Sequence, residues 1–118
     1  MSVTQSSPLV APIFVVVAPT ETTLCSFTRD QLKGAKRVTV QVFNMDAAQT
    51  FTGTVYRRKA GMDAWAPSTV PDFFSVNALL SVMADLDVEG TDELEVRGSM
   101  SGAGGTVQIG ATRKASTP

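Results

Sequence analysis

The sequence predicts an all-β domain, either an antiparallel β-sandwich or a small barrel, with about seven short strands. Apolar and polar residues alternate through most of the chain, and clusters of Gly, Pro and Asp separate the alternating stretches at short intervals. The chain has 118 residues, of which 43% are apolar and 18% charged, enough for one domain with its own core. Short strands joined by turns of this kind build stacked or closed antiparallel sheets.

The N-terminal residues predict an extended arm over residues 1–12, because they are largely polar and punctuated by Pro8 and Pro12. The sandwich is expected to span residues 13–113, and residues 114–118 are expected to form a short C-terminal tail. Within the sandwich, the β-branched run 13–18 and the alternating run 22–27 each predict a strand. A polar break that contains Gly34 follows them.

The clearest alternation covers residues 37–44 and 50–59, and each stretch predicts a strand with one buried face. The apolar positions are Val38, Val40 and Val42 in the first stretch and Phe51 and Val55 in the second. We expect the two strands to pair as a hairpin across Asn44–Asp46. The next stretch, residues 60–72, is rich in Gly, Pro, Asp and Ala and predicts a long connection from one sheet to the other.

Residues 75–84 are compatible with two structures. Four apolar residues follow the spacing of one helical face and Asp72 could cap the start, so a short helix is slightly favoured. The four residues are Val76, Leu79, Leu80 and Met83. The segment also alternates enough for a strand, and this alternative remains open.

Three further strands are expected over residues 84–89, 93–100 and 106–113. The glycine-rich segment Ser101–Gly105 predicts a hairpin turn between the last two, since no Lys-Ser or Lys-Thr follows it as a phosphate loop requires. The acidic run 85–90 begins like a calcium-binding EF-hand loop, but Val96 stands where the bidentate Glu is needed. We therefore expect a solvated strand face there and no metal site.

The composition excludes several classes of function. The chain has no His, so Ser-His-Asp and Cys-His catalysis are impossible, and we expect no enzyme, catalytic residue, cofactor or small-molecule substrate. A net charge of −1 argues against nucleic-acid binding. The lone Cys25 cannot form an intrachain disulfide and is expected to be a small buried hydrophobe.

Nothing in the sequence indicates a membrane. The most apolar stretch, residues 9–18, is too short for a spanning helix and is interrupted by Pro12. The first basic residue is Arg29, after that stretch, whereas a signal peptide carries its basic residues before it. We therefore expect synthesis in a cytoplasm.

Aromatic and basic residues near the middle of the chain supply candidate contacts. Arg57 and Arg58 point to opposite faces of their strand, so they form no single basic patch. Trp65, Phe73 and Phe74 lie in or beside the long connection, either as part of the core or as anchors at a subunit interface.

The order of strands and turns over residues 37–113 resembles small β-sandwich virion proteins of tailed bacteriophages, including capsid decoration (cement) proteins. The matching features are Val38–Asn44, Phe51–Tyr56, the lone Trp65, Glu93–Gly98 and Ser101–Val107. The resemblance implies a non-catalytic virion protein that docks on the outside of the major capsid shell. Such proteins often form homo-oligomers, trimers in particular, and stabilise the head by bridging capsomers.

On this resemblance, the contact residues are expected in the arm and among the loop aromatics. They are Val3, Leu9, Val10, Trp65, Phe73 and Phe74. The alternative is a head-fibre or tail-associated module that recognises a host surface or a glycan. That alternative needs an exposed aromatic platform, for which one Trp and one Tyr supply little material.

Overall fold

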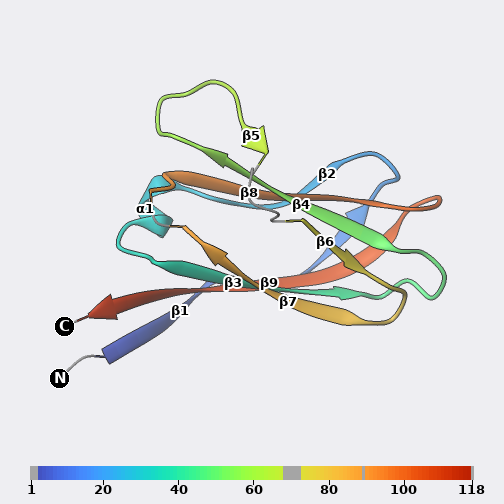
Figure 1. Ribbon diagram of the computed structural model, residues 1–118. Helices are drawn as coiled ribbons and strands as arrows, with labels where there is room; N and C mark the ends of the chain where they lie inside the picture. The colour runs from blue at the N-terminus through green and yellow to red at the C-terminus, as the bar shows by residue number, and fades with distance from the viewer. Residues whose placement is uncertain (1–2, 68–72, 89, 118) are drawn as a thin grey trace.

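The computed structural model of the chain is a sandwich of two antiparallel β-sheets (Figure 1). It describes residues 3–67, 73–88 and 90–117, and the side chains of residues 12–66, 75–88 and 90–114. The elements are β1 (Val3–Val17), β2 (Thr22–Phe27), α1 (Arg29–Leu32), β3 (Arg37–Asn44), β4 (Phe51–Arg58), β5 (Ala66–Pro67), β6 (Phe73–Val76), β7 (Ser81–Asp87), β8 (Glu93–Met100) and β9 (Gly105–Thr117).

The first sheet, called sheet A, has the strand order β1-β9-β3-β7. The second, sheet B, has the order β2-β8-β4, and β5 and β6 both pair with the remaining edge of β4. No described strand of one sheet pairs with a strand of the other, so the sheets do not close into a barrel. The prediction of an all-β sandwich is thus confirmed.

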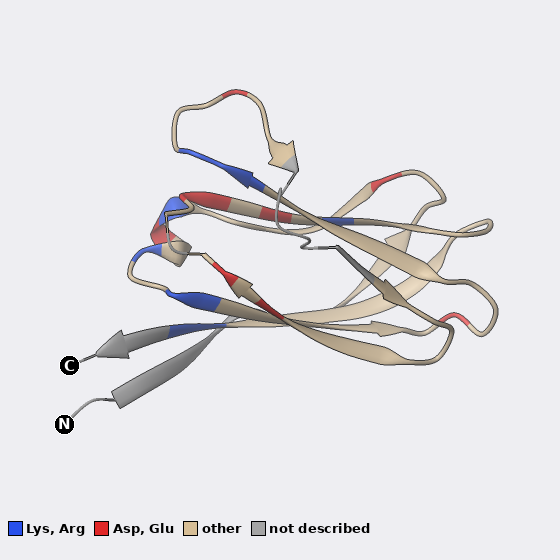
Figure 2. Ribbon diagram, viewed as in Figure 1, with Lys and Arg blue, Asp and Glu red and all other residues tan. Residues whose placement is uncertain are grey.

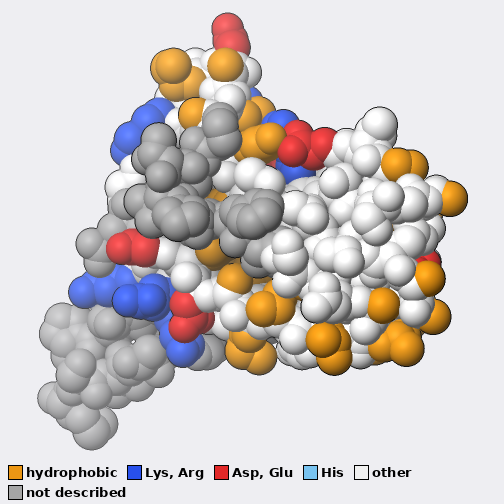
Figure 3. Space-filling view, turned by 45° about the vertical axis from the view of Figure 1, so that its right-hand side comes forward, with side chains coloured by type: hydrophobic (Ala, Val, Ile, Leu, Met, Phe, Trp, Pro, Cys, Tyr) orange, Lys and Arg blue, Asp and Glu red, His pale blue; other side chains and the backbone are white. Residues whose placement is uncertain are grey.

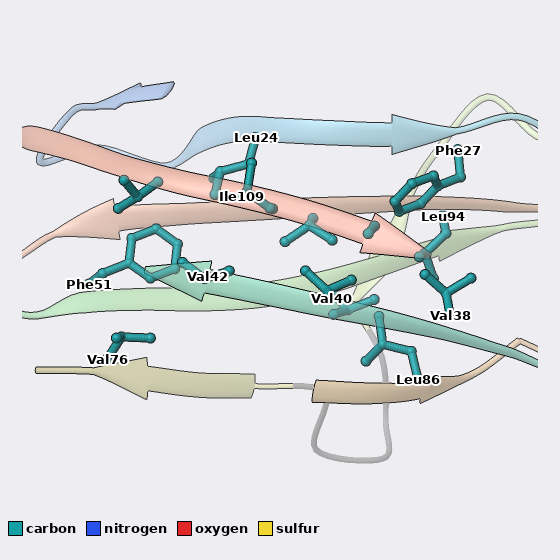
Figure 4. Packing of buried hydrophobic residues seen from close by; sticks show 14 of the residues in the cluster. Leu24, Phe27, Val38, Val40, Val42, Phe51, Val76, Leu86, Leu94 and Ile109 are labelled. Carbon is teal, nitrogen blue, oxygen red and sulfur yellow. The ribbon is translucent and has the colours of Figure 1, made fainter. Parts of the chain in front are cut away.

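The core lies between the sheets because the alternating strands turn their apolar faces toward each other (Figure 4). Val38, Val40 and Val42 of β3 are buried, and Phe51 and Val55 of β4 are buried opposite them. The Phe51 ring lies directly on Gly98 of β8, where an added Cβ would come within 2.3 Å of Cζ. Only a glycine leaves room for the ring at that position.

The predicted hairpin between residues 37–44 and 50–59 is wrong. β3 pairs with β7 and β9 in sheet A, whereas β4 pairs with β8 in sheet B. The short link between them therefore crosses from one sheet to the other. Alternation shows that a strand has one buried face, but it does not show which strand lies beside it.

Two other connections also differ from expectation. β8 belongs to sheet B and β9 to sheet A, so Ser101–Gly105 crosses between sheets and is no hairpin turn. The segment 60–72 was expected to cross, yet β5 and β6 both pair with β4 and the chain stays in sheet B. These two strands are so short that the turn residues around them mask any alternation.

The short helix expected near residues 75–84 is also wrong, because this segment is the end of β6, a tight turn and β7. Of the four residues expected on one buried helical face, Val76 is buried, whereas Leu79 and Leu80 are 57% exposed and Met83 is 64% exposed. Pairing of β6 with β4 and of β7 with β3 overrides the helical spacing.

The one helix in the described part of the chain, α1, lies in the expected polar break. Thr28 caps it, because its hydroxyl accepts a hydrogen bond from the Gln31 amide while the Gln31 side chain accepts one from the Thr28 amide. This Thr-x-x-Gln capping box was visible in the sequence.

The expected N-terminal arm and C-terminal tail form a two-stranded ribbon with each other. β1 continues past residue 12, where the arm was expected to end, and β9 continues past residue 113, where the tail was expected to begin. Val3 of β1 pairs with Thr117 of β9. Figure 1 shows this ribbon leaving the sandwich at the end where both termini lie. Register shifts after Pro8 and Val10 accommodate the prolines in β1.

A buried polar network joins three of the four links that cross between the sheets at the other end, which we call the crossover end. Asn44, which is fully buried, donates through Nδ2 to the carbonyls of Gln49 (2.8 Å) and Val76 (3.0 Å), and its Oδ1 accepts from the Asp46 amide (3.0 Å). These bonds connect the link after β3 to the end of β6.

Gln49 extends the network to the glycine-rich crossover. Its Oε1 accepts from the amides of Gly102 (2.9 Å) and Gly104 (3.0 Å), and its Nε2 donates to the Gly104 carbonyl (2.7 Å). A Cβ at Gly102 would lie 2.9 Å from Gln49 Oε1, and one at Gly105 would lie 2.7 Å from Asp46 Oδ2. The glycines therefore admit these two side chains against the backbone.

We predict that Asn44→Ala lowers the free energy of unfolding by about 2–4 kcal/mol, because it leaves two carbonyls and one amide without their partner in a buried site. Urea unfolding measures the change. Asn77→Ala, which truncates an exposed side chain in the turn before β7, is the matched control. Equal stability of the two variants would contradict the role of Asn44.

Asp46 makes part of the stability depend on pH. The amides of Ala48 and Gln49 donate to its carboxylate and hold its pKa below the ordinary value. A lowered carboxyl pKa stabilises the fold above the pKa of the unfolded chain, and this contribution disappears as the pH falls through the folded-state pKa. We predict that Asp46→Asn is less stable than the original chain at pH 7 and loses less stability between pH 5 and about pH 2. Parallel thermal-unfolding profiles would exclude this role.

Candidate functional site

The two outer faces of the sandwich have opposite chemistry. On sheet A, the side chain of Phe14 is 65% exposed, that of Val16 76% and that of Met83 64%. In the register of this sheet, Phe43 of β3 lies between Phe14 of β1 and the strand β7. We call Phe14, Val16, Phe43 and Met83 the apolar face. The neighbouring positions are Thr, Gln and Gly, such as Thr106, Gln108 and Gly110 of β9, whereas Arg37, Asp85 and Asp87 occupy the other end of the same outer face.

The apolar face continues onto the crossover end. Leu79 and Leu80 are each 57% exposed in the turn before β7, and Met45 is 40% exposed just after β3. In Figure 3, hydrophobic side chains gather along the lower right of the molecule, over the strands of sheet A and this end. Exposed apolar side chains in such a group are typical of an interaction surface.

The outer face of sheet B is polar and its charges are internally paired. Arg58 forms two hydrogen bonds with Glu93, at 3.0 and 3.1 Å, and its guanidinium lies 4.2 Å from the centre of the Trp65 ring. Arg97 lies 4.0 Å from the centre of the Tyr56 ring and forms an ion pair with Glu95 at 2.5 Å. We call this surface the charged face.

Hydrogen bonds organise the charged face further. The Tyr56 hydroxyl donates to Glu21 at 2.7 Å, which raises the Tyr56 pKa. Burial opposes ionisation of Glu95, but hydrogen bonds from Arg97, Thr23 and Ser26 outweigh it and lower its pKa. Figure 2 shows charged residues on the strands of sheet B, near α1, and on the parts of β3, β7 and β9 close to it, whereas the crossover end is mostly uncharged. The charges on this face are therefore satisfied within the chain.

The residues expected as contacts do not come together. Val3, Leu9 and Val10 belong to β1 at one edge of sheet A, and their side chains lie outside the described part. Phe73 and Phe74 pair through their backbones with β4 at the far edge of sheet B, and their side chains likewise lie outside it. Since β1 packs over β2 and β6 packs over β3, these two groups lie on opposite sides of the sandwich.

Trp65 is half-exposed and lies on the charged face, away from β1. The exposed residues Phe14, Val16 and Met83 were not singled out from the sequence. A signal existed for the first two, because the run Ile13–Val17 is apolar at consecutive positions and a strand at a sheet edge cannot bury both of its faces.

Arg57 and Arg58 point to opposite faces, as predicted. Arg57 Nη1 donates to the Asp87 carbonyl (2.8 Å) and the Thr91 hydroxyl (3.1 Å), so it links β4 to the end of β7, whereas Arg58 lies on the charged face.

The described residues offer little for metal or acid–base chemistry. They contain no group of three Cys, Asp or Glu side chains placed to hold a metal ion. Asp85 and Asp87 are exposed on β7, where Asp85 accepts a hydrogen bond from Thr39, and Glu89 lies outside the described residues. No helix in the described part is long and apolar enough to cross a membrane.

A pocket of about 390 Å³ lies between α1 and the loop after β7. Charged residues of both signs line it, namely Arg29, Asp30, Lys33 and Asp92. The Ala60 amide donates to Asp92 at 3.0 Å and lowers the pKa of this carboxyl, which therefore stays ionised at neutral pH. A carboxylate held in this way is a poor proton donor.

Cys25 of β2 is partly buried and packs against the core. Burial raises the pKa of its thiol to about 12, and the nearby charge of Glu95 adds to the shift. Because the thiolate is the reactive form, we expect the Cys25 thiol to react slowly at neutral pH.

The comparisons with known proteins show the fold. No protein-family model matches the sequence, and a search of curated proteins finds no relative. The crystal structure of the SPBc2 prophage-derived protein YomS is similar, with a TM-score of 0.57, 10% sequence identity, and coverage of 98% of this chain and 96% of that one. The chain is also similar to a protein of Bacillus endospore appendages, described as disulfide-linked pili, with a TM-score of 0.50, 11% identity, and coverage of 97% and 88%.

We predict that the folded chain reacts with a thiol reagent such as DTNB at pH 8 at least about a hundredfold more slowly than the chain unfolded in guanidinium. A Met83→Cys variant, which adds a thiol at a position 64% exposed, is the matched control and should react rapidly once while folded. Fast reaction of Cys25 in the folded chain would contradict its protection by burial.

Proposed function

We propose that the chain is a non-enzymatic structural protein of a phage virion, a capsid decoration (cement) protein that binds the outside of the head and bridges capsomers. On this proposal it is synthesised in the host cytoplasm and ends on the capsid surface. Its partner is the major capsid protein shell, together with further copies of the chain. It uses no cofactor, nucleic acid, membrane or small-molecule substrate.

The observation that carries the proposal is the contrast between the two outer faces. The apolar face combines three side chains that are more than 60% exposed with mostly uncharged neighbours, apart from Asp85 next to Met83 on β7, whereas the charged face satisfies its own charges through ion pairs. A docked protein needs one surface for its partner and one for solvent. The whole-length similarity to a prophage-derived protein supports a phage origin of the architecture.

The mechanism would be additive. A stable contact with the shell buries on the order of 1,000 Å² or more, and one sheet face with its adjoining loops can supply such an area. Many copies on one head would each contribute a modest free energy of binding. A contact that spans two capsomers then strengthens the lattice through multivalency.

The alternative of a glycan- or host-binding module is less well supported. Sugars stack on open aromatic faces, but one face of Trp65 and one face of Tyr56 are already covered by guanidinium groups at 4.2 and 4.0 Å. A disulfide-linked assembly, such as the pili of the Bacillus endospore appendages, is also unsupported, because the single cysteine is buried and protonated.

We predict that Met83→Lys weakens binding to phage heads that lack the protein by at least about tenfold, because it places a charge in a desolvated contact. Co-sedimentation with heads measures binding, and the temperature of head disruption measures stabilisation. Thr52→Lys, in the middle of sheet B on the charged face, is the matched control and should bind normally. Binding that falls with Thr52→Lys and not with Met83→Lys would contradict the proposed docking face.

A further inference from the structure

Three of the four sheet edges in the sandwich carry a feature that prevents pairing with another strand. β7 presents the exposed carboxylates Asp85 and Asp87 along its edge. β2 is six residues long and irregular between Thr23 and Cys25. The far edge of sheet B is divided between β5, with two residues, and β6, with four.

The edge formed by β1 is different. β1 is fifteen residues long, and residues 1–20 contain no charged side chain. The part of β1 before Ile13 contains Pro8, Pro12 and two register shifts, which interrupt the edge. From Ile13 to Val17 the register with β9 is regular and no proline occurs. No described strand pairs with the second edge of this segment.

The side chains of the same segment are exposed in the single chain. Ile13 is 42% exposed, Phe14 65% and Val16 76%. A strand added beside β1 would cover Phe14 and Val16 on the apolar face and Ile13 at the margin of the core. An added strand would therefore supply hydrogen-bond partners for the backbone groups of this edge and packing partners for its side chains.

We propose that β1 pairs with β1 of a second copy of this chain, antiparallel and about a two-fold axis near Val15. In this register Phe14 lies opposite the partner subunit's Val16, and Val16 lies opposite the partner subunit's Phe14. Ile13 likewise lies opposite the partner subunit's Val17. The two four-stranded sheets then join into one sheet of eight strands.

A second copy fits this edge for two reasons. The segment is centred on Val15 with an apolar residue at every position, so every cross-strand pair in the antiparallel register is apolar. An aromatic residue opposite a β-branched one is a favourable pair, and here it occurs twice by symmetry. The absence of charges from the segment also removes the like-charge repulsion that separates identical edges.

The pairing also makes the apolar faces of the two copies continuous. Phe14 and Val16 lie on the outer surface of sheet A, so the joined sheet would present one apolar surface, next to the crossover end, about twice as wide. Antiparallel pairing of identical strands needs a two-fold axis, so this contact gives a dimer and not the trimer implied by the phage resemblance. The inference goes beyond the proposed function and does not depend on it.

The first test is the mass of the full chain in solution, measured by light scattering over a range of concentrations without capsids. We expect a dimer that dissociates on dilution. Val16→Lys should raise the dissociation constant by at least about tenfold, because both Phe–Val pairs are lost and a charge enters the edge. Met83→Lys, which adds the same charge at a comparably exposed position on the opposite edge strand β7, should leave the mass unchanged.

A second measurement keeps the test independent of any effect of lysine on folding. In the proposed dimer the two copies of residue 16 are diagonal neighbours, about 7–8 Å apart. A Val16→Cys variant should therefore be joined into a covalent dimer by a short bismaleimide, whereas Met83→Cys should not. Cys25 should react only slowly, because it is partly buried and the pKa of its thiol is raised.

A monomer at all concentrations, a trimer, or a dimer that crosslinks through Met83→Cys and not through Val16→Cys would each overturn the β1 pairing. None of these outcomes affects the prediction that Met83→Lys weakens binding to phage heads. Conversely, a dimer that does not bind phage heads would contradict the decoration role and would still support the β1 pairing. The two proposals therefore fail separately.

Discussion

The fold depends on the buried amide of Asn44. Four links cross between the sheets at the crossover end, and three of them carry the chain from β3 to β4, from β6 to β7 and from β8 to β9. Asn44 and Gln49 hydrogen-bond to backbone atoms near all three. Hydrophobic packing brings two sheets face to face but allows them to slide, whereas directed hydrogen bonds in a buried site fix how they meet. The network thus sets the register on which both outer faces depend.

A consequence is a molecule with two unlike surfaces. The charged face is stabilised by Arg58 and Arg97, each of which holds a carboxylate and covers an aromatic ring. The apolar face has no such internal partners, and its hydrophobic side chains are left in water. Part of the outer face of sheet A, next to the crossover end, thus lacks charges, whereas the outer face of sheet B pairs its own.

The similarity to a prophage-derived protein and to an appendage protein fits this arrangement, because both align over nearly the whole of this chain at about one-tenth sequence identity. At that level the shared feature is the architecture alone. Two sheets with outward side chains free to vary can present different contact surfaces on the same core. The contact surface proposed for this chain therefore rests on its own residues, above all the uncharged strand β1 and the exposed positions of β7.

By itself, the sequence determined the class of fold, most strand positions and several exclusions. The strands over 22–27, 37–44 and 93–100 were predicted at the bounds found, because alternation with period two is a local property of a half-buried strand. Composition likewise excludes His-dependent catalysis, because the chain has no His, and an intrachain disulfide, because it has one Cys. Tertiary structure alone decided which strands are neighbours. These pairings replace the hairpin expected after Asn44 and the helix expected around Leu79. Strand pairing is a contact between distant segments, and local patterns carry no record of it. For the same reason Trp65 could be noticed in the sequence, whereas the face formed by Phe14, Phe43 and Met83 exists only once β1, β3 and β7 lie in one sheet.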